Sequence, residues 1–324
     1  MKVLILGGTG FIGRHLTEFF ASNPNNSVEA TYFQSNPFNS HRVKWHQVDL
    51  RKPGSLEGVA HDQDLVIQAA ATTSGMAEIA TKVDFHITDN VVMNAHVLRT
   101  IHASQVKHFI FFSCITMLKS SMSPQKESDY SEADAVHPRY FGIGWTKVYI
   151  EKLCEHYSRH NTTKKYTVIR HSNVYGPGDK FDPQKSHVLA ATVNKVLLAS
   201  SKVEVWGNGM ECRDFVFVKD LVELVGLIGE KQNDNYILVN CGGSAFLSTT
   251  ELTKLVIRQS GKSFLEIKYD TNKPTVDFSA RVNTDLAKHL FGWTPRTPFE
   301  IGIQETIDYW NSMRSLDPSW PLSK

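Results

Sequence analysis

The sequence predicts an α/β protein with a doubly wound parallel sheet, followed by a smaller mixed α/β domain. Three observations carry this prediction. Short apolar runs alternate with longer segments of helical periodicity in the first half of the chain, and such alternation is typical of parallel sheets with right-handed crossovers. A glycine-rich turn follows the first apolar run. After about residue 173 the alternation gives way to shorter elements.

The first half is expected to hold six strands, because each apolar run is short and ends in turn-forming residues. These strands are Val3–Leu6, Val28–Phe33, Val43–Val48, Leu65–Ala70, Phe109–Phe112 and Tyr166–Arg170. Helical spacing of apolar residues predicts helices at Phe11–Phe20, Asp84–Ser104 and Ile143–Arg159.

The second half is expected to hold a helix at Val188–Ala199 and short strands near Val203–Val205 and Phe215–Val218. Thr249 or Thr250 is the expected cap of a further helix that ends near Gly261. We therefore divide the chain into residues 1–173 and a substrate domain of residues 174–324. Segments near 214–243 and 277–290 are expected to return to the first domain.

Composition excludes several classes of protein. The net charge of the 324 residues is only +2, with scattered Lys and Arg, so a nucleic-acid partner is not expected. No stretch approaches the roughly 20 apolar residues of a membrane span. The four cysteines lie far apart, which argues against a metal site and a disulfide framework and favours a reducing cytoplasm.

The turn after the first strand has glycines at positions 7, 10 and 13. Gly7 permits the tight turn, Gly10 lets a pyrophosphate approach the backbone, and Gly13 lets the helix pack on the strand. The helix start at Phe11 and Ile12 offers free N–H groups to phosphate. The loop therefore predicts a Rossmann-type domain that binds a dinucleotide.

Further cofactor contacts are expected where later strands end. Asp49 and Leu50 end the third strand, where the adenine would lie. Ala69 and Ala70 end the fourth strand, and Asn173 follows the sixth. We expect all of these residues to contact the cofactor.

The second strand indicates which nicotinamide cofactor binds. An acidic residue at its end would hydrogen-bond the ribose 2′-hydroxyl of NAD. The sequence there is Thr31-Tyr32-Phe33-Gln34-Ser35, without Asp or Glu, and Arg42 follows. Since Arg42 could meet a 2′-phosphate, NADP is the predicted cofactor and NAD the alternative.

Motifs of the second half extend the pattern. They are Ser172-Asn173-Val174-Tyr175-Gly176-Pro177, Ser186-His187-Val188, Val205-Trp206-Gly207-Asn208-Gly209, Arg213-Asp214-Phe215, Asp270-Thr271-Asn272-Lys273-Pro274 and Phe291-Gly292-Trp293-Thr294-Pro295. With the glycine loop, these motifs resemble the extended short-chain dehydrogenase/reductase superfamily, and in order and spacing the GDP-L-fucose synthase family within it. The likeness covers nearly the whole chain.

The resemblance implies an NADPH-dependent enzyme that epimerises GDP-4-keto-6-deoxymannose at two carbons and then reduces its ketone. By position it implies Cys114 and His187 as the epimerisation pair and Lys147 as the cofactor-side lysine. The implied contacts to the nucleotide diphosphate are Lys195, Trp206, Arg213 and Arg281. A homodimer formed by the helices Asp84–Ser104 and Ile143–Arg159 is expected by the same analogy.

The residue types suit that chemistry. Removing a proton beside a ketone requires a base on one ring face and an acid on the other. A thiol and an imidazole, with ordinary pKa values of about 8.5 and 6.5, serve near neutral pH. Taken singly, Cys114 is as readily a buried structural thiol, His187 a surface residue and Trp206 a core aromatic. Their joint placement favours the functional interpretation.

The catalytic hydroxyls of the superfamily are replaced. Its tyrosine sits four residues before the lysine, where this chain has Ile143, and Phe112 takes the place of a Ser or Thr, with Ser113 beside it. A dehydratase is disfavoured because residues 113–117 contain no acid. Three accounts remain: Tyr140 supplies the proton, the chain only epimerises and keeps a non-redox cofactor, or it is a non-catalytic NAD(P)-binding regulatory subunit.

Overall fold

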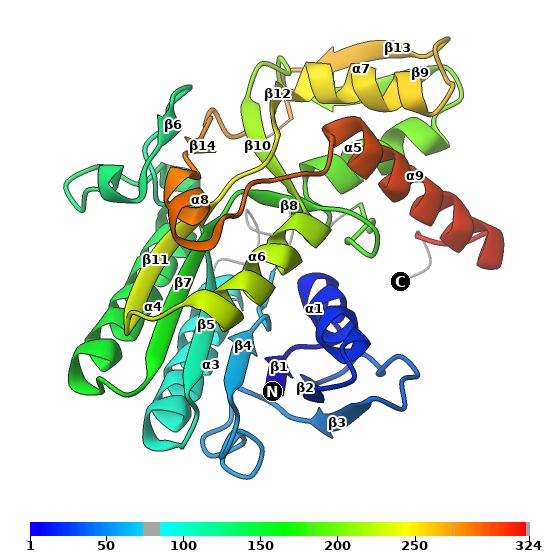
Figure 1. Ribbon diagram of the computed structural model, residues 1–324. Coiled ribbons are helices and arrows are strands. Elements are labelled where there is room, and N and C mark those ends of the chain that lie inside the picture. Colours follow the sequence, from blue (N-terminus) through cyan, green and yellow to red (C-terminus); the bar gives the residue numbers. More distant parts are fainter. Residues whose placement is uncertain (74–84, 184, 274, 322–324) are drawn as a thin grey trace.

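The computed structural model describes residues 1–73, 85–183, 185–273 and 275–321. Its large sheet has seven strands in the order β11-β7-β5-β4-β1-β2-β3 (Figure 1). The strands are β1 (Lys2–Leu6), β2 (Ser27–Tyr32), β3 (Val43–Gln47), β4 (Leu65–Gln68), β5 (His108–Cys114), β7 (Lys165–His171) and β11 (Tyr236–Cys241). Neighbouring strands pair in parallel. The predicted doubly wound sheet is confirmed, and β11 adds a strand from within the segment expected to return.

The strand order reverses between β1 and β4. Leu6 pairs with Gln68, so the glycine loop after β1 and the residues after β4 begin at the same edge of the sheet. In open α/β sheets, ligands bind outside the carboxyl ends of the strands at such a reversal. The topology therefore places the candidate site at this edge.

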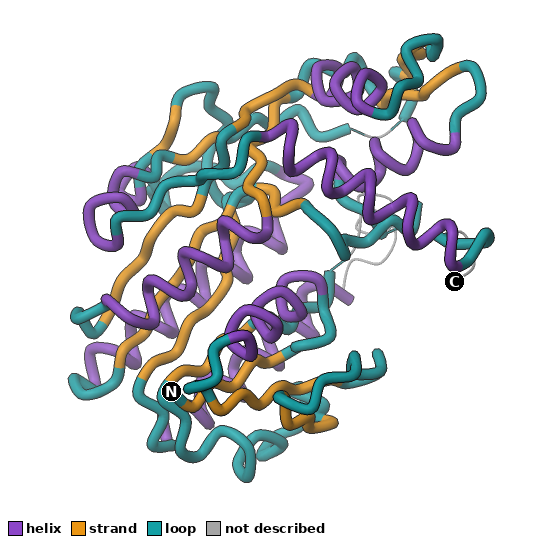
Figure 2. Tube along the Cα trace, turned by 45° about the vertical axis from the view of Figure 1, so that its right-hand side comes forward, coloured by secondary structure: helices purple, strands orange, loops and turns teal. Residues whose placement is uncertain are grey.

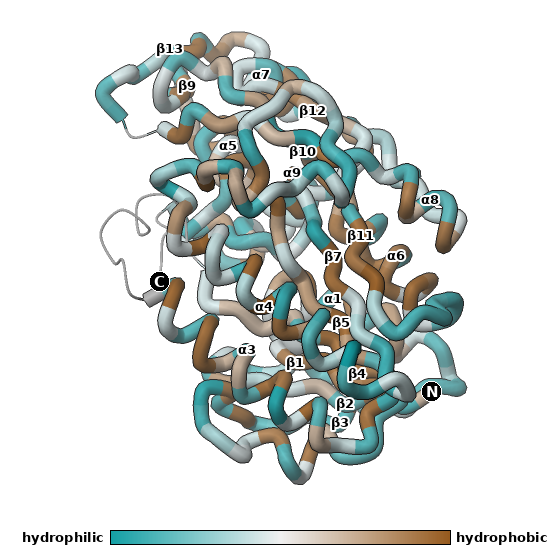
Figure 3. The backbone as a smooth tube through the Cα atoms, turned by 90° about the vertical axis from the view of Figure 1, so that its left-hand side faces the viewer, coloured by the Kyte–Doolittle hydropathy of each residue, from teal (hydrophilic) through white to brown (hydrophobic). Residues whose placement is uncertain are grey.

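Helices cover both faces of the sheet, so that β1 is buried on both sides. Val3 and Ile5 belong to one apolar cluster and Leu4 and Leu6 to another. The first cluster holds residues of α1 (Phe11–Ser22), α6 (Val218–Lys231) and α8 (Asp285–Phe291). The second holds residues of α3 (Phe85–Ala103) and α4 (Phe141–His160). Figure 2 shows the sheet between these helices, and Figure 3 the hydrophobic residues along its strands.

A smaller group of elements lies at the carboxyl edge of the sheet, at the top of Figure 1. It contains a sheet of β8 (Asn173–Tyr175), β10 (Cys212–Phe217) and β12 (Ala245–Ser248), and the pair β9 (Lys202–Trp206) and β13 (Glu266–Asp270). Its helices are α5 (Val188–Leu198), α7 (Thr249–Gln259) and α9 (Phe299–Leu316). They share one apolar core. The short strands β6 (Pro124–Gln125) and β14 (Arg281–Val282) pair beside it.

Two helix starts differ from the prediction. Ser248, rather than Thr249 or Thr250, caps α7: its hydroxyl accepts from the Glu251 N–H, and Glu251 bonds back. This reciprocal capping box satisfies two backbone donors at once. The segment before α4 is a 3₁₀ turn, Pro138–Tyr140, so the α-helix itself starts at Phe141. The expected start of the second long helix, Asp84, lies outside the described residues. Among the described helices, none has the length and apolarity of a membrane span.

Candidate active site

One cavity of about 540 Å³ joins the carboxyl edge of the large sheet to the smaller group of elements. At one end it is lined by Gly10, Phe11 and Ile12 of the glycine loop. At the other end it reaches Trp206 and Thr253. Residues far apart in the sequence therefore line a single cavity, large enough for a drug-sized ligand.

Close packing fixes the glycine loop. The N–H groups of Gly7 and Gly8 donate to the side-chain and backbone oxygens of Thr31 on β2, at 2.9 and 2.8 Å. Gly7 has a φ of +79°, which favours glycine. A Cβ on Gly13 would lie 2.0 Å from the Gly7 carbonyl oxygen. The loop thus has the backbone geometry that its spacing predicts.

The first turn of α1 faces the cavity without a side-chain cap. Its N–H groups and positive dipole end form an anion site. The neighbouring wall consists of Ala69 and Ala70, whose small side chains leave room for a ligand. The residues present therefore fit a dinucleotide pyrophosphate.

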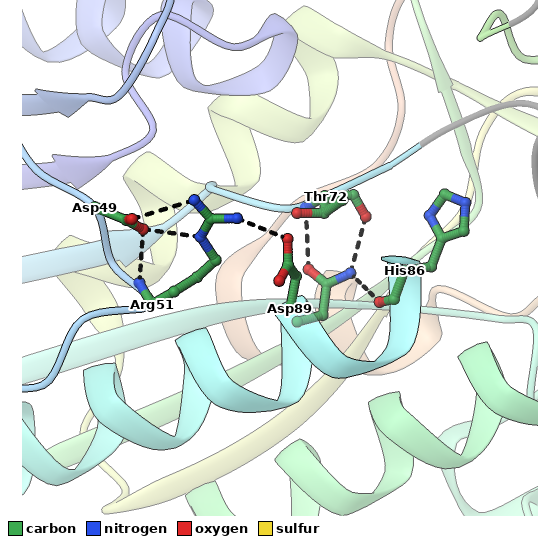
Figure 4. Close-up of polar contacts among 6 residues, drawn as sticks. Asp49, Arg51, Thr72, His86 and Asp89 are labelled. Atoms are coloured by element: carbon green, nitrogen blue, oxygen red, sulfur yellow. Dashed lines mark hydrogen bonds and ion pairs between the residues drawn. The ribbon is translucent and has the colours of Figure 1, made fainter. Parts of the chain in front are cut away.

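Asp49 follows β3, and an arginine occupies its carboxylate (Figure 4). Arg51 donates to both Asp49 oxygens at 2.9 and 3.1 Å, and to Asp89 of α3 at 3.0 Å. The Arg51 guanidinium lowers the pKa of Asp49. An adenine amine would therefore share Asp49 with Arg51. Leu50 is buried beside it, 6% exposed.

The strand-end segment after β4 is tied to α3. Asn90 donates to the Thr72 carbonyl at 2.8 Å and accepts from the Thr72 N–H at 3.1 Å (Figure 4). His86, at the start of α3, lies beside this amide and lines the cavity. These bonds hold Ala70–Thr73 along the cavity wall.

Arg42 does not lie where the NADP interpretation places it. Its guanidinium donates to the Ser22 carbonyl at 3.4 Å, at the end of α1. That helix end lies at the amino edge of the sheet, because α1 runs back from the glycine loop before β2 begins. The helix spans 12 residues, about 18 Å, which separates Arg42 from the carboxyl edge.

Cys114 and Lys147 both line the cavity and lie within electrostatic reach of each other. Cys114 ends β5, and its Sγ lies 3.0 Å from the Thr116 hydroxyl. Lys147 of α4 donates from Nζ to the Phe112 carbonyl at 2.8 Å, and burial lowers its pKa. Both side chains line the cavity.

His187 and Tyr140 line other parts of the same cavity. His187 is the residue before α5 and makes no side-chain capping bond, and the surrounding protein lowers its pKa to about 4. The neutral imidazole is therefore the resting form near neutral pH. The Tyr140 ring packs on Phe278, with centroids 5.3 Å apart, and burial raises its pKa.

The positions of the missing hydroxyls also face the cavity, since Ile143 and Phe112 both line it. Ser113 does not restore a hydroxyl. It is fully buried and donates to Glu151 at 2.5 Å, and Glu151 is paired with Arg170 at 2.6 Å. Because successive strand residues point to opposite faces, Ser113 turns away from the cavity that Cys114 lines.

Three of the four expected nucleotide contacts lie at the far end. The Lys195 ammonium sits 4.7 Å from the Trp206 ring centroid, and Trp206 Nε1 donates to Glu204 at 2.9 Å. Arg213 also lines the cavity. Arg281, on β14, is not among the residues that line the cavity. Its guanidinium lies 5.8 Å from the Phe246 ring centroid.

Comparison with known proteins decides the family. The model of the NAD dependent epimerase/dehydratase family matches residues 3–242. The chain belongs to this family. The resemblance to extended short-chain dehydrogenases/reductases is thereby confirmed.

Relatives of this family member include nucleotide-sugar enzymes. The chain is 29% identical to GDP-L-fucose synthase of Azorhizobium caulinodans over 317 residues, covering 95% of this chain and 96% of that one. It is 26% identical to GDP-mannose 3,5-epimerase of Arabidopsis thaliana, covering 96% and 82%. Among solved structures, UDP-glucose 4-epimerase of Thermotoga maritima with UDP-glucose superposes with a TM-score of 0.83 at 24% identity, covering 97% and 99%. That likeness shows the fold.

Three cavity residues of this family member escaped the sequence reading. His171 ends β7 opposite Cys114, and its Nδ1 donates to the Ser172 carbonyl at 2.7 Å, which leaves Nε2 as an acceptor. Asp179 and Glu211 each hold one buried carboxylate oxygen without a partner among the described residues. The position of His171 at the end of a predicted strand could have identified it as a site residue. No sequence signal could have identified the buried oxygens of Asp179 and Glu211, because their burial depends on the packing of the folded chain.

Proposed function

We propose that the protein is an NAD(P)-dependent nucleotide-sugar epimerase/reductase that acts on a GDP-linked 4-keto-6-deoxy sugar. One observation carries the proposal: a single cavity holds the glycine loop, the Cys114 and His187 side chains, and the Lys195–Trp206 pair. The named relatives support the class of substrate. We assign the sugar nucleotide to the domain of residues 174–324 and the cofactor to residues 1–173.

In the proposed epimerisation, Cys114 and His187 handle protons at carbons next to the ketone. They come from different elements, β5 and the start of α5, which suits an acid and a base on opposite faces of a sugar ring. A neutral His187 accepts the proton as a base, and the Cys114 thiol returns one to the other face. Lys147, held by the Phe112 carbonyl, would hold the ribose of a bound cofactor.

A bound nicotinamide cofactor would supply or accept hydride at the ketone carbon. Reduction also needs a proton donor for the ketone oxygen. Tyr140 is the candidate, because its phenol lines the cavity within electrostatic reach of Cys114. Epimerisation alone is the second candidate function, and it is favoured by the two apolar side chains, Ile143 and Phe112, at the hydroxyl positions.

NADP remains the proposed cofactor, although Arg42 no longer supports it. No carboxylate follows β2 in Phe33-Gln34-Ser35. The Arg51 guanidinium lies 5.1 Å from the Phe33 ring centroid, so a cation stands beside the end of β2. We propose that Arg51 meets the 2′-phosphate by exchanging one of its carboxylate partners, which gives a modest preference over NAD.

The decisive test incubates the protein with NADPH and a GDP-4-keto-6-deoxy sugar in D₂O. Absorbance follows NADPH oxidation and mass spectrometry follows deuterium in the sugar. Oxidation that is lost in Tyr140→Phe supports the relocated proton donor. Deuterium uptake without oxidation supports epimerisation alone. If the protein is silent in both readouts, the catalytic proposal is wrong and a regulatory subunit becomes the better account.

The proposed assembly is a homodimer through α3 and α4. Phe141, Trp145 and Tyr149 form an exposed aromatic stripe at four-residue spacing on α4, with Tyr149 50% exposed. Such a stripe lies on one helix face, and exposed apolar patches mark interaction sites. Light scattering of wild type and Trp145→Glu tests it, with a shift toward monomer expected in the variant. A cytoplasmic location stays a prediction from the cysteine pattern.

A further inference from the structure

The reaction centre of the cavity has a histidine, His171, that takes no part in the proposed epimerisation. His171 ends β7 and is the parallel register partner of Cys114 at the end of β5. Two residues earlier on these strands, Phe112 and Ile169 belong to the same apolar cluster. Because side chains alternate along a strand, Cys114 and His171 point to that same side of the sheet, and both line the cavity.

One hydrogen bond fixes the tautomer of the His171 ring. Nδ1 lies 2.7 Å from the Ser172 carbonyl oxygen, and a carbonyl only accepts hydrogen bonds, so Nδ1 carries the proton of the neutral ring. The ring packs edge to face with Phe112, with centroids 6.1 Å apart. Removal from bulk water, with smaller contributions from Lys147 and His187, lowers the pKa of His171 to about 4. Near neutral pH, Nε2 is therefore an acceptor without a proton.

Nε2 of His171 is open to a ligand in the cavity. Among the described residues it has no hydrogen-bond partner, and unlike the buried unpaired oxygens of Asp179 and Glu211 it keeps accessible surface. The residue is partly exposed and lines the cavity. A hydrogen-bond donor on a bound ligand can therefore reach this nitrogen.

The protonation state of Nε2 decides which ligand group it binds. An imidazole nitrogen without a proton accepts a hydrogen bond and repels carbonyl and phosphate oxygens, which are themselves acceptors. The ketone oxygen of a keto sugar therefore does not face Nε2, whereas a hydroxyl does. Phe112, which packs beside the ring, has no polar side-chain atom to compete for that hydroxyl.

The position of His171 beside Cys114 indicates which hydroxyl. In a 4-keto-6-deoxy sugar, one hydroxyl stands on a carbon beside the ketone, at C3. Cys114 is the proposed acid at a carbon beside the ketone, and neighbouring strands lie only about 4.8 Å apart. A substituent on that carbon is therefore within reach of the side chain that ends the next strand, His171.

We propose that His171 Nε2 accepts a hydrogen bond from the C3 hydroxyl of the sugar as it binds before epimerisation. His171 thereby makes the enzyme selective for 4-keto sugars that carry this hydroxyl. The same nitrogen repels the ketone oxygen, so one side chain sets which way round the sugar ring lies. The inference rests on the proposed function, since it assumes a keto sugar beside Cys114.

Two sugars that differ only in this hydroxyl test the inference. GDP-4-keto-6-deoxymannose and its 3-deoxy analogue are incubated in D₂O with the protein saturated with NADP⁺, which cannot reduce the ketone. NMR follows the loss of the C5 proton, which both sugars carry beside the ketone. The wild-type kcat/KM is expected to be about 10- to 100-fold higher for the 3-hydroxy sugar, because the analogue leaves the acceptor unpaired.

Three variants locate the effect at His171. His171→Phe keeps an aromatic ring but removes the acceptor, so the ratio of the two kcat/KM values is expected to fall to about one. His171→Gln offers an amide oxygen as acceptor and is expected to retain part of the ratio. His61→Phe changes an exposed histidine outside the cavity lining and is expected to keep the wild-type ratio. Circular dichroism verifies that each variant is folded.

Several outcomes overturn the inference. Equal kcat/KM values in wild type remove the selectivity for the hydroxyl but leave the proposed epimerisation intact. A ratio that survives in His171→Phe assigns the selectivity to another residue. If His171→Phe keeps the ratio and weakens NADPH binding about tenfold, Nε2 binds the amide of the cofactor and not the sugar. Absence of exchange in both sugars contradicts the proposed function itself, and the inference with it.

Discussion

The cofactor end of the cavity and its reaction centre are built from different kinds of contact. At the cofactor end, backbone groups and missing side chains do the positioning: Gly7, Gly10 and Gly13 leave room, and the start of α1 offers N–H groups. At the reaction centre, side chains carry the chemistry, and two positions hold Phe112 and Ile143. Backbone contacts to a cofactor do not depend on which side chains stand at the reaction centre. Binding a cofactor and using it in a reaction are therefore separable properties.

The largest expected effect probes the reaction centre. Cys114→Ser is expected to lower deuterium exchange into a keto-sugar by about 10³-fold, since a hydroxyl is a far weaker acid–base group than a thiol. Mass spectrometry of the sugar measures it. Cys212→Ser, whose thiol is outside the cavity lining, is the control and keeps wild-type exchange. Unchanged exchange in Cys114→Ser would remove this thiol from the mechanism.

Restoring a hydroxyl sharpens the comparison. Ile143→Tyr places a phenol one helical turn before Lys147, on the same face. Because Lys147 is already held in the cavity, NADPH oxidation with the keto-sugar is expected to rise about 100-fold. Stopped-flow absorbance measures the rate, and Ile143→Phe controls for ring size. Equal rates in the two variants would show that the missing hydroxyl is not what limits reduction.

The pH dependence of stability tests whether the protein buries a charge at Asp179. Burial raises the pKa of Asp179 to about 7, well above its value of 3.8 in an unfolded chain. The folded state therefore binds this proton more tightly, and its stability falls as pH rises from about 4 through 7. Asp179→Asn is expected to stabilise the cofactor-free protein by about 2 kcal/mol at pH 8 and by little at pH 4.

Denaturant unfolding at both pH values measures this difference. Asp277→Asn changes an exposed carboxylate and is expected to leave stability unchanged at both. A stabilisation of Asp179→Asn that is the same at pH 4 and pH 8 would contradict the burial of charge.

A smaller effect probes the cofactor end. Gly13→Ala puts a Cβ 2.0 Å from the Gly7 carbonyl oxygen, so the helix must move off the loop. NADPH binding, followed by fluorescence titration, is expected to weaken about tenfold, a free-energy change of about 1.4 kcal/mol. The control is Gly58→Ala, where a Cβ meets nothing within 4 Å. Wild-type affinity in Gly13→Ala would show that the close packing of the glycine loop is not needed for cofactor binding.

The smallest effect concerns the choice of cofactor. Arg51→Ala is expected to weaken NADPH binding about fivefold relative to NADH, because one charge-assisted contact to the 2′-phosphate is lost. Arg42→Ala, at the opposite edge of the sheet, is expected to change neither affinity. A ratio that stays constant in Arg51→Ala would favour NAD as the natural cofactor.

Local signals were enough for most of the sheet and for the glycine loop. Buried runs such as Val3–Leu6 and the spacing of Gly7 and Gly13 are properties of neighbouring residues, and the structure reproduces them. The sequence does not predict strand β11. Apolar and polar residues do not alternate clearly along it, and only its pairing with β7 shows where it lies. Arg42 and Arg281 were misplaced because a position in the chain does not tell which edge or face a long side chain reaches.

The anchor of Lys147 makes the position of this lysine independent of the side chain at residue 112. The lysine is held by the main-chain carbonyl of residue 112 and not by its side chain. Every amino acid brings the same carbonyl, so mutation at that position leaves the lysine in place. A substitution of Phe112 therefore changes a side chain that lines the cavity while the acceptor of the lysine stays the same.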